Sequence, residues 1–306
     1  MSGDQLAVSL ASATPRDTRP RRSWYCHLHR SDLIWSAAFA APYAVMFLAF
    51  AVSPIGAALW MARDPSLYAT LLSDSHYLQA AANTSLFVGV GVNVQMCLAL
   101  LLSGFFARRR RWIKMVLIVF MLPWTLPAAP AYLSFHWMLI TGPMGFLDHL
   151  LRLVCGVDGP DWLLDRWLAV GCDMVAAIWK WLPLWTVILL GGRMAIPRDL
   201  YDAAEIDGAS AFRCLIHVTA PLLANLYLIS TLISAIWTVG DYAPALFVSS
   251  GAPGYASSVI SLLSFHYAFD TVRPALGVAA AVSMLPLLIA MIALLTRALA
   301  RTEVQL

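Results

Sequence analysis

Charged residues are scarce in this chain of 306 residues. They make up 12% of it, whereas soluble globular proteins carry about a quarter. Hydrophobic residues make up 60%, and the mean hydropathy is +0.73. This composition excludes an ordinary soluble domain and predicts an integral membrane protein.

Motifs for nucleotide binding and hydrolysis are also missing. The chain has two lysines, Lys114 and Lys180, and neither follows a glycine, so a P-loop is excluded. No histidine pair has the His-Glu-x-x-His spacing of a zinc hydrolase, and no serine lies in a Gly-x-Ser-x-Gly turn. We therefore expect no enzyme activity, metal or cofactor in this chain, and any energy that its function needs must come from outside the chain.

Long apolar stretches are what the chain does contain. A bilayer core needs about 20 mostly apolar residues per helical crossing, and six stretches approach or exceed that length. The sequence therefore predicts an all-α protein with six transmembrane helices, at about 33–61, 84–106, 115–139, 168–191, 222–248 and 275–298. The third contains three prolines, which membrane helices tolerate when neighbours satisfy the freed backbone groups.

Arginine and lysine placement predicts the orientation. With the N-terminus inside, 15 of the 20 basic residues fall on the cytoplasmic side, as the positive-inside rule requires. We expect a basic, disordered cytoplasmic tail at 1–32, one membrane domain at 33–300 and a cytoplasmic tail at 301–306. The arginine run 108–111 is explained by this rule, so we expect contact with a lipid bilayer and none with nucleic acid.

A polar segment at about 193–221 interrupts the apolar pattern on the expected cytoplasmic side. Pro197 suits the first turn of a helix, Gly208 suits a left-handed helix end, and Ser210 suits the N-cap of the next helix. We expect Pro221 to end that second, short helix before the fifth crossing. The pattern predicts a helix, a glycine turn and a helix.

Two partners are open for this segment. It could be an amphipathic helix lying on lipid headgroups. However, four acids lie within nine residues beside an anionic membrane surface: Asp199, Asp202, Glu205 and Asp207. They favour a protein partner.

The segment resembles the loop shared by the permease subunits of ATP-binding-cassette (ABC) importers, with its Glu-Ala-Ala, three-residue gap, glycine and Ile-x-Leu-Pro pattern. Asp202-Ala203-Ala204, Gly208 and the run 218–221 stand at these positions, with Asp202 replacing the usual glutamate. The resemblance covers about residues 33–300. Four further segments look like the carbohydrate-importing branch: Asn83-Thr84-Ser85, Leu122-Pro123-Trp124, Trp179-Lys180-Trp181 and Tyr267-Ala268-Phe269. Two others look like the first permease of the maltose or glycerol-phosphate type in that branch: Gly240-Asp241-Tyr242 and Ser249-Ser250-Gly251-Ala252-Pro253.

The resemblance implies the type I ABC importer permease fold and inward transport of a sugar or sugar derivative. It also implies a heterodimer with a second permease, two ATPase subunits that bind ATP and Mg, and an extracytoplasmic substrate-binding protein. In such importers the loop docks in a groove on the ATPase. The expected docking residues are Asp202, Ala203, Ala204, Asp207, Gly208 and Phe212.

Polar and aromatic residues within the crossings are candidates for the substrate path, because polar groups are costly in a bilayer. Asp173 and Lys180 lie two helical turns apart and could pair across a path or orient helices. Tryptophans such as Trp185 could stack on sugar or form interface belts, and the polar side chains could bind hydroxyls or join helices. The candidates are Trp124, Asp173, Lys180, Trp181, Asn225, Ser230, Ser234, Trp237 and Asp241.

Other functions remain open from sequence. The chain could be an ABC permease for a non-sugar solute. A secondary transporter could use Asp173, Lys180 and Asp241 for proton coupling, although no internal repeat is visible. A membrane scaffold could recruit a soluble partner through the loop.

Overall fold

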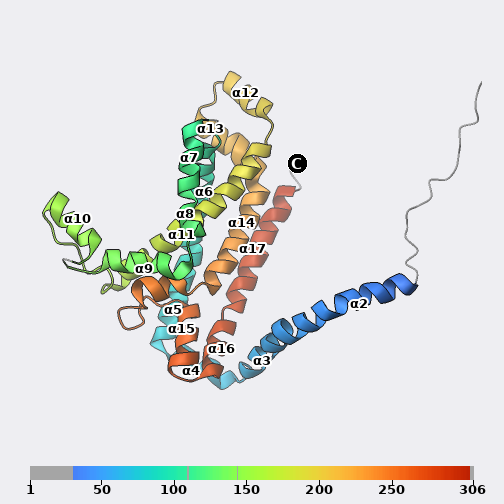
Figure 1. Cartoon of the computed structure of the whole chain (residues 1–306), viewed down its shortest axis with the longest axis vertical. Helices are drawn as coiled ribbons and strands as arrows, with labels where there is room; N and C mark the ends of the chain where they lie inside the picture. Colours follow the sequence, from blue (N-terminus) through green and yellow to red (C-terminus); the bar gives the residue numbers. More distant parts are fainter. Residues whose placement is uncertain (1–29, 109, 143, 304–306) are drawn as a thin grey trace, which may run out of the picture. The chain divides into compact units, whose positions relative to one another are not determined.

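The computed structural model describes residues 30–108, 110–142 and 144–303, and this part of the chain is helical, without strands (Figure 1). Most of the predicted tail at 1–32, and 304–306 of the tail at 301–306, lie outside the described residues. The described residues divide after Ile55 into two compact units, which we describe separately.

The first unit is one apolar helical run. It consists of α2 (Arg30–Phe47), the π-helical turn η1 (Leu48–Val52) and the start of α3 (Ser53–Met61). From Trp35 to Met61 the run is long and apolar enough to cross a bilayer. It matches the first predicted crossing.

Near the start of the second unit, two helices each have an aspartate as their N-cap. Asp64 caps α4 (Pro65–Ser73) by accepting the Ser66 N–H, and Asp74 caps α5 (Ser75–Leu86) by accepting the His76 N–H. α5 continues through η2 (Phe87–Val92) into α6 (Asn93–Phe106). The second crossing therefore begins earlier than predicted, because Asp74 starts the helix before the apolar stretch does.

The third predicted crossing is bent. It consists of α7 (Arg111–Phe120), α8 (Leu122–Thr125) and α9 (Ala128–Leu139), and the chain turns by 96° between α8 and α9. Leu126 is extended there, as expected for a residue before proline, and Pro127 is the N-cap of α9. Our prediction of one continuous helix over 115–139 was wrong. Figure 1 shows α9 lying across the direction of α7.

The fourth crossing is α11 (Arg166–Ala195), which Asp165 caps. Before it stands a short helix, α10 (Phe146–Cys155). The buried Asp148 carboxylate accepts hydrogen bonds from the Gly142 N–H and the Trp162 Nε1–H, both at 2.8 Å. These donors hold the pKa of Asp148 below its usual value, because they stabilise the charged form.

The fifth crossing is longer than predicted. The run 211–249 consists of α13 (Ala211–Cys214), η3 (Leu215–Thr219), α14 (Ala220–Gly240) and η4 (Ala245–Ser249). Pro221 does not end a helix, contrary to our prediction. It lies in the first turn of α14, where the missing N–H costs little, directly after the π-helical turn.

The last crossing follows the short helix α15 and a π-helical turn. This part contains α15 (Ile260–Phe265), η5 (His266–Asp270), α16 (Pro274–Val282) and α17 (Leu285–Glu303). Gly277 lets α16 approach α15 closely, since a Cβ there would lie 2.6 Å from the Ser264 carbonyl oxygen.

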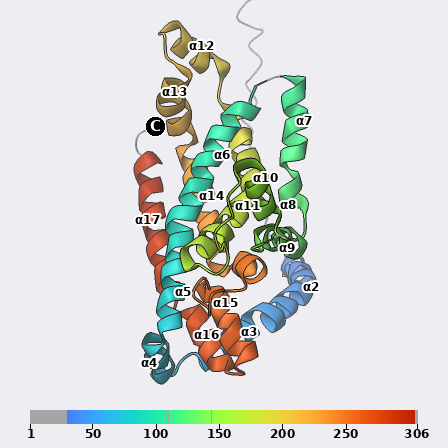
Figure 2. The ribbon, with the colours of Figure 1, turned by 90° about the vertical axis from the view of Figure 1, so that its left-hand side faces the viewer.

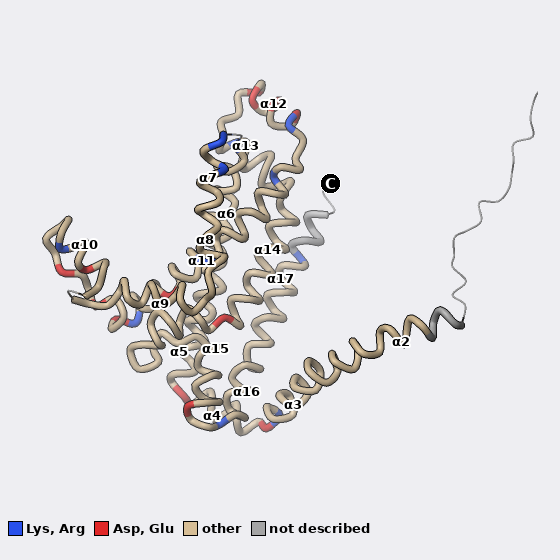
Figure 3. The backbone as a smooth tube through the Cα atoms, viewed as in Figure 1, with Lys and Arg blue, Asp and Glu red and all other residues tan. Residues whose placement is uncertain are grey.

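The core of the second unit lies where α6 packs along α11. Met96, Ala99, Trp185 and Leu189 are buried there. Figures 1 and 2 show α12 (Arg198–Ile206) and α4 at opposite ends of this bundle. In Figure 3, Lys and Arg gather around α12, α13 and the start of α7, and the bundle between the two ends is largely uncharged.

The described residues contain five helices that are long and apolar enough to cross a membrane, and six crossings if the bent pair counts as one. The all-α membrane architecture is therefore confirmed. The side of the membrane on which each terminus lies stays a prediction.

Candidate functional site

The polar segment at 193–221, which we call the coupling loop after the resemblance, has the predicted helix, glycine turn and start of a second helix, but that helix continues past Pro221. α12 follows Pro197 and ends at Asp207, and Gly208 adopts a left-handed φ of +73°. The Ala209 N–H donates to the Ala204 carbonyl at 2.9 Å, and the Gly208 N–H donates to that of Glu205 at 3.0 Å. This pair of bonds is a Schellman motif, which needs the left-handed residue.

The next helix begins as predicted at Ser210, whose hydroxyl accepts the Arg213 N–H. Five of the six expected docking residues are exposed, and Ala204 is half-buried. Phe212 leaves 66% of its surface exposed. Exposed apolar side chains beside acids, in a loop with fixed helix ends, suit a protein partner.

Three residues of this loop were not among the expected docking residues: Ile206, Tyr201 and Thr219. Ile206 is 87% exposed at the end of α12. Tyr201 and Thr219 share a hydrogen bond of 3.1 Å between their hydroxyls, which ties α12 to η3. The period of three to four residues in α12 was the signal for Tyr201, because it places that residue beside the half-buried Ala204.

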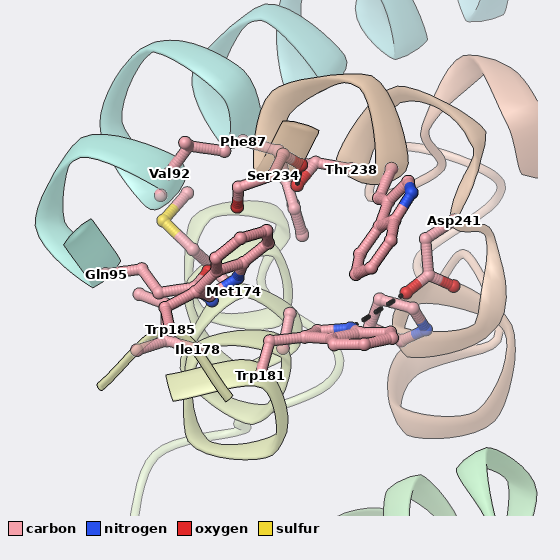
Figure 4. Close-up of a pocket in the computed structure, with 14 residues that line it drawn as sticks. Phe87, Val92, Gln95, Met174, Ile178, Trp181, Trp185, Ser234, Thr238 and Asp241 are labelled. Carbon is pink, nitrogen blue, oxygen red and sulfur yellow. Dashed lines mark hydrogen bonds between the residues drawn. The ribbon is translucent and has the colours of Figure 1, made fainter. Parts of the chain in front are cut away.

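A second candidate site lies within the bundle. We call it the tryptophan cavity: it lies between η2, α6, α11 and α14 (Figure 4), and its open interior is small, about 30 Å³. The ring centroids of Trp181 and Trp185 lie 5.5 and 5.6 Å from that of Trp237. Apart from these three, its lining includes Phe87, Gln95, Met174, Ile178, Ser234, Thr238 and Asp241.

Polar groups enter the cavity from several helices. Trp181 Nε1–H donates to Asp241 Oδ2 at 3.4 Å, the bond dashed in Figure 4, and the Ala243 N–H donates to Asp241 Oδ1 at 3.0 Å. Gln95 Nε2 is buried without a hydrogen-bond partner. An unpaired buried donor costs free energy, so a ligand that accepts its hydrogen bond would be favoured. Gln95 was not among our sequence candidates.

The predicted substrate-path residues divide into two groups. Trp181, Ser234, Trp237 and Asp241 come together at the cavity. The remaining candidates do not line it: Trp124, Asp173, Lys180, Asn225 and Ser230. Of these, Trp124 is exposed on α8, Ser230 is buried in α14, and Asn225 has a buried Oδ1 without a partner.

Lys180 has a structural position at the bend of the third crossing. Its Nζ donates to the carbonyls of Leu126 at 2.6 Å and Pro123 at 3.3 Å. The bend frees these carbonyls from helical hydrogen bonds, and the buried ammonium satisfies them. Lys180 does not pair with Asp173, so that interpretation was wrong. Two turns of helix separate the residues by about 10 Å, and each meets different neighbours.

Asp173 belongs to a buried network that holds the segment after η4. Its Oδ2 accepts the Ser249 hydroxyl at 2.7 Å, and Ser249 and Ser257 hydroxyls lie 2.9 Å apart. From α5, Asn83 donates to the carbonyls of Ala256 and Ser258. Two of the segments that carry the family resemblance, around residues 83 and 249, therefore meet in space.

Comparison with known proteins gives a consistent result. The model of the family "Binding-protein-dependent transport system inner membrane component" matches residues 95–303. The chain is similar to the trehalose/maltose transport system permease protein MalF of Thermococcus litoralis, with 27% identity over 239 residues covering 74% of this chain and 80% of the relative. It is also similar to the sn-glycerol-3-phosphate transport system permease protein UgpA of Brucella abortus, with 29% identity over 232 residues covering 74% and 76%.

A solved structure has the same fold. A chain of a bacterial ABC transporter involved in the import of the acidic polysaccharide alginate superposes with a TM-score of 0.77 at 18% identity, over 90% of this chain and 97% of the other. At that identity the likeness concerns the fold. It confirms the importer permease architecture expected from the sequence.

Proposed function

Because this chain belongs to the family of inner-membrane components of binding-protein-dependent transport systems, we propose that it is the sugar-conducting permease subunit of an ATP-driven importer. The family makes it a multi-pass inner-membrane permease, which removes the secondary-transporter and scaffold alternatives. Relatives named for trehalose, maltose and glycerol phosphate support a sugar or sugar derivative as the solute.

The observation that carries the sugar assignment is the tryptophan cavity. Its indole faces suit the apolar C–H faces of a pyranose, and polar groups around them suit the hydroxyls. Gln95 on α6, Ser234 on α14 and Asp241 at the C-cap of α14 supply donors and acceptors. A site shared between helices can change its affinity when the helices move, as a transport cycle requires.

Uptake by the complete importer in proteoliposomes tests this assignment. A panel of mono- and disaccharides that includes trehalose and maltose would be supplied with the binding protein outside and ATP inside. We expect at least one sugar to be imported, and Trp237→Ala to raise its apparent KM about tenfold, equivalent to about 1.4 kcal/mol. Trp137→Ala is the matched control, because Trp137 is exposed and lies outside the cavity.

Two results would count against a sugar. One is an active importer that takes up no member of the panel, and the other is an equal effect of the two tryptophan substitutions. A cationic solute is the second candidate, because three indoles beside the Asp241 carboxylate also suit a quaternary ammonium group. Choline in the same assay separates the two.

We further propose that the coupling loop docks an ATPase subunit. The chain has no P-loop, so ATP and Mg would be bound by that partner, in two copies. The heterodimeric second permease and the extracytoplasmic binding protein complete the proposed assembly. Transport then needs a coupling free energy between the nucleotide site and the cavity, typically about 1–3 kcal/mol.

Co-purification of the ATPase tests the docking proposal. Ile206→Glu places a charge on an exposed side chain at the end of α12, so folding should be unaffected while an apolar contact is lost. We expect at least tenfold less ATPase to co-purify. Leu72→Glu, at a side chain 63% exposed on α4 at the other end of the bundle, should leave the yield unchanged. Equal retention by both variants would place the ATPase elsewhere.

A further inference from the structure

Two adjoining cavities lie at the end of the bundle that carries α12. Their volumes are about 540 and 420 Å³, and both are lined by Gly104, Arg108, Arg193 and Tyr201. They are therefore two parts of one hollow between α6, α11 and α12, which we call the arginine cavity. None of its residues lines the tryptophan cavity.

Arg193 is built into this hollow. It lies in the last turn of α11, and its guanidinium rests on α6 at Gly104, where a Cβ would stand 2.1 Å from Nη1. Glycine is required at position 104 for this close approach. Arg193 Nε is buried and has no hydrogen-bond partner. The guanidinium as a whole is half-buried, and its buried N–H without a partner calls for an acceptor.

The two arginines lack counter-ions within the described residues. Neither Arg193 nor Arg108 lies within ion-pair distance of a carboxylate there, although Glu205 lines the first part of the cavity and Asp202 the second. Arg108 is exposed and stands 5.9 Å from the Phe105 ring. The guanidinium groups of Arg108 and Arg193, on neighbouring helices, therefore face one space that Arg198 also lines, and they form no ion pair with an acid of the described residues.

We propose that the arginine cavity binds a phosphate-bearing anion between Arg108 and Arg193. A guanidinium presents paired N–H donors that match two phosphate oxygens. Two guanidinium groups therefore bind a phosphate better than two point charges do. Leu101 and Phe105 give the same cavity an apolar wall at the end of the α6 crossing. A phospholipid headgroup, with its chains along that wall, and a free phosphate compound share this chemistry. Basic pockets between transmembrane helices are known to hold anionic headgroups.

Binding to the purified full-length chain in detergent tests the site. The probes are phosphatidylglycerol, the diacylglycerol with the same chains but no phosphate, and inorganic phosphate. Bound lipid is counted by native mass spectrometry, and each probe is also titrated against the thermal unfolding midpoint. We expect phosphatidylglycerol or inorganic phosphate to bind and the diacylglycerol not to.

Substitutions assign the binding to this cavity. Arg193→Gln and Arg108→Gln should each weaken it at least about fivefold, and Arg193→Lys should weaken it less because the charge remains. Lys114→Gln is the matched control, an exposed cation on α7 outside the cavity, and should change binding less than twofold. Arg108 is exposed, so its variant also guards against misfolding of the Arg193 variants.

The result identifies the source of the anion. Phosphatidylglycerol binding that inorganic phosphate does not displace indicates a lipid site, and binding of inorganic phosphate alone indicates a free phosphate compound. The proposal is overturned if the diacylglycerol binds as well as phosphatidylglycerol, if neither anion binds, or if Lys114→Gln weakens binding as much as the two arginine variants.

Discussion

The coupling loop and the tryptophan cavity differ in how their apolar side chains are packed. In the loop, Ile206 and Phe212 are exposed and packed against little of this chain, while the backbone is held by caps. In the cavity, Trp181, Trp185 and Trp237 pack on one another. The apolar side chains of the loop are therefore free to contact a partner, whereas the tryptophans of the cavity already contact one another within this chain.

The largest expected effect concerns the interior. Lys180→Met keeps the length of the side chain but leaves the carbonyls of Pro123 and Leu126 unpaired. We expect about 3 kcal/mol less stability, seen as a thermal unfolding midpoint in detergent about 5–10 °C lower. Lys114→Met, at an exposed position on α7, should lower the midpoint by less than about 1 °C. Similar small shifts for both would show that the bend does not depend on Lys180.

A smaller effect is expected from the loop backbone. Gly208 and Gly156 both end helices with positive φ, +73° and +68°, and a Cβ at either would meet nothing within 4 Å. Valine at either position should therefore cost about 1–2 kcal/mol through backbone strain alone. Gly208→Val should reduce ATP-driven uptake in proteoliposomes, because it disturbs the docking helix. Gly156→Val, after α10, should leave uptake unchanged. If uptake were normal in Gly208→Val with the assembly intact, the loop would not transmit the ATPase motion.

The smallest effect is a pH dependence at Asp148, in the segment between the third and fourth crossings. The folded pKa of Asp148 lies below the unfolded value, so its contribution to stability is present above about pH 4 and is lost as the pH falls through the folded pKa. The thermal midpoints of the wild type and Asp148→Asn should therefore differ at pH 6 and converge toward pH 3. A difference that stayed constant between these pH values would mean that the Gly142 and Trp162 donors do not favour the carboxylate.

Local sequence patterns predicted the loop well because its structure depends on nearby residues. Pro197, Gly208 and Ser210 each act within one turn of the chain, and all three stand where predicted. Pro221 was misread, since a proline can begin a helix as well as end one, and the π-helical turn before it leaves no spacing signal.

The interior depended on tertiary structure, which a single sequence shows poorly. The residue types of the cavity were predicted, but nothing in their spacing joins Gln95 on α6 to Trp237 on α14. Helical periodicity placed Asp173 and Lys180 on one face of a helix. In the structure, however, Asp173 accepts a hydrogen bond from Ser249, and Lys180 donates to a carbonyl at the bend between α8 and α9. The length of the apolar stretch predicted the third crossing. The 96° turn within it lies at Pro127, one of the three prolines in that stretch.

The most direct test of the account is a paired measurement on the reconstituted importer, in which ATPase co-purification and the KM of sugar uptake are determined for Trp237→Ala and Ile206→Glu. The account predicts that Trp237→Ala keeps its ATPase and raises the KM about tenfold, while Ile206→Glu loses the ATPase and with it all ATP-driven uptake. ATPase loss in Trp237→Ala, or an Ile206→Glu importer that keeps its ATPase and transports normally, would contradict it.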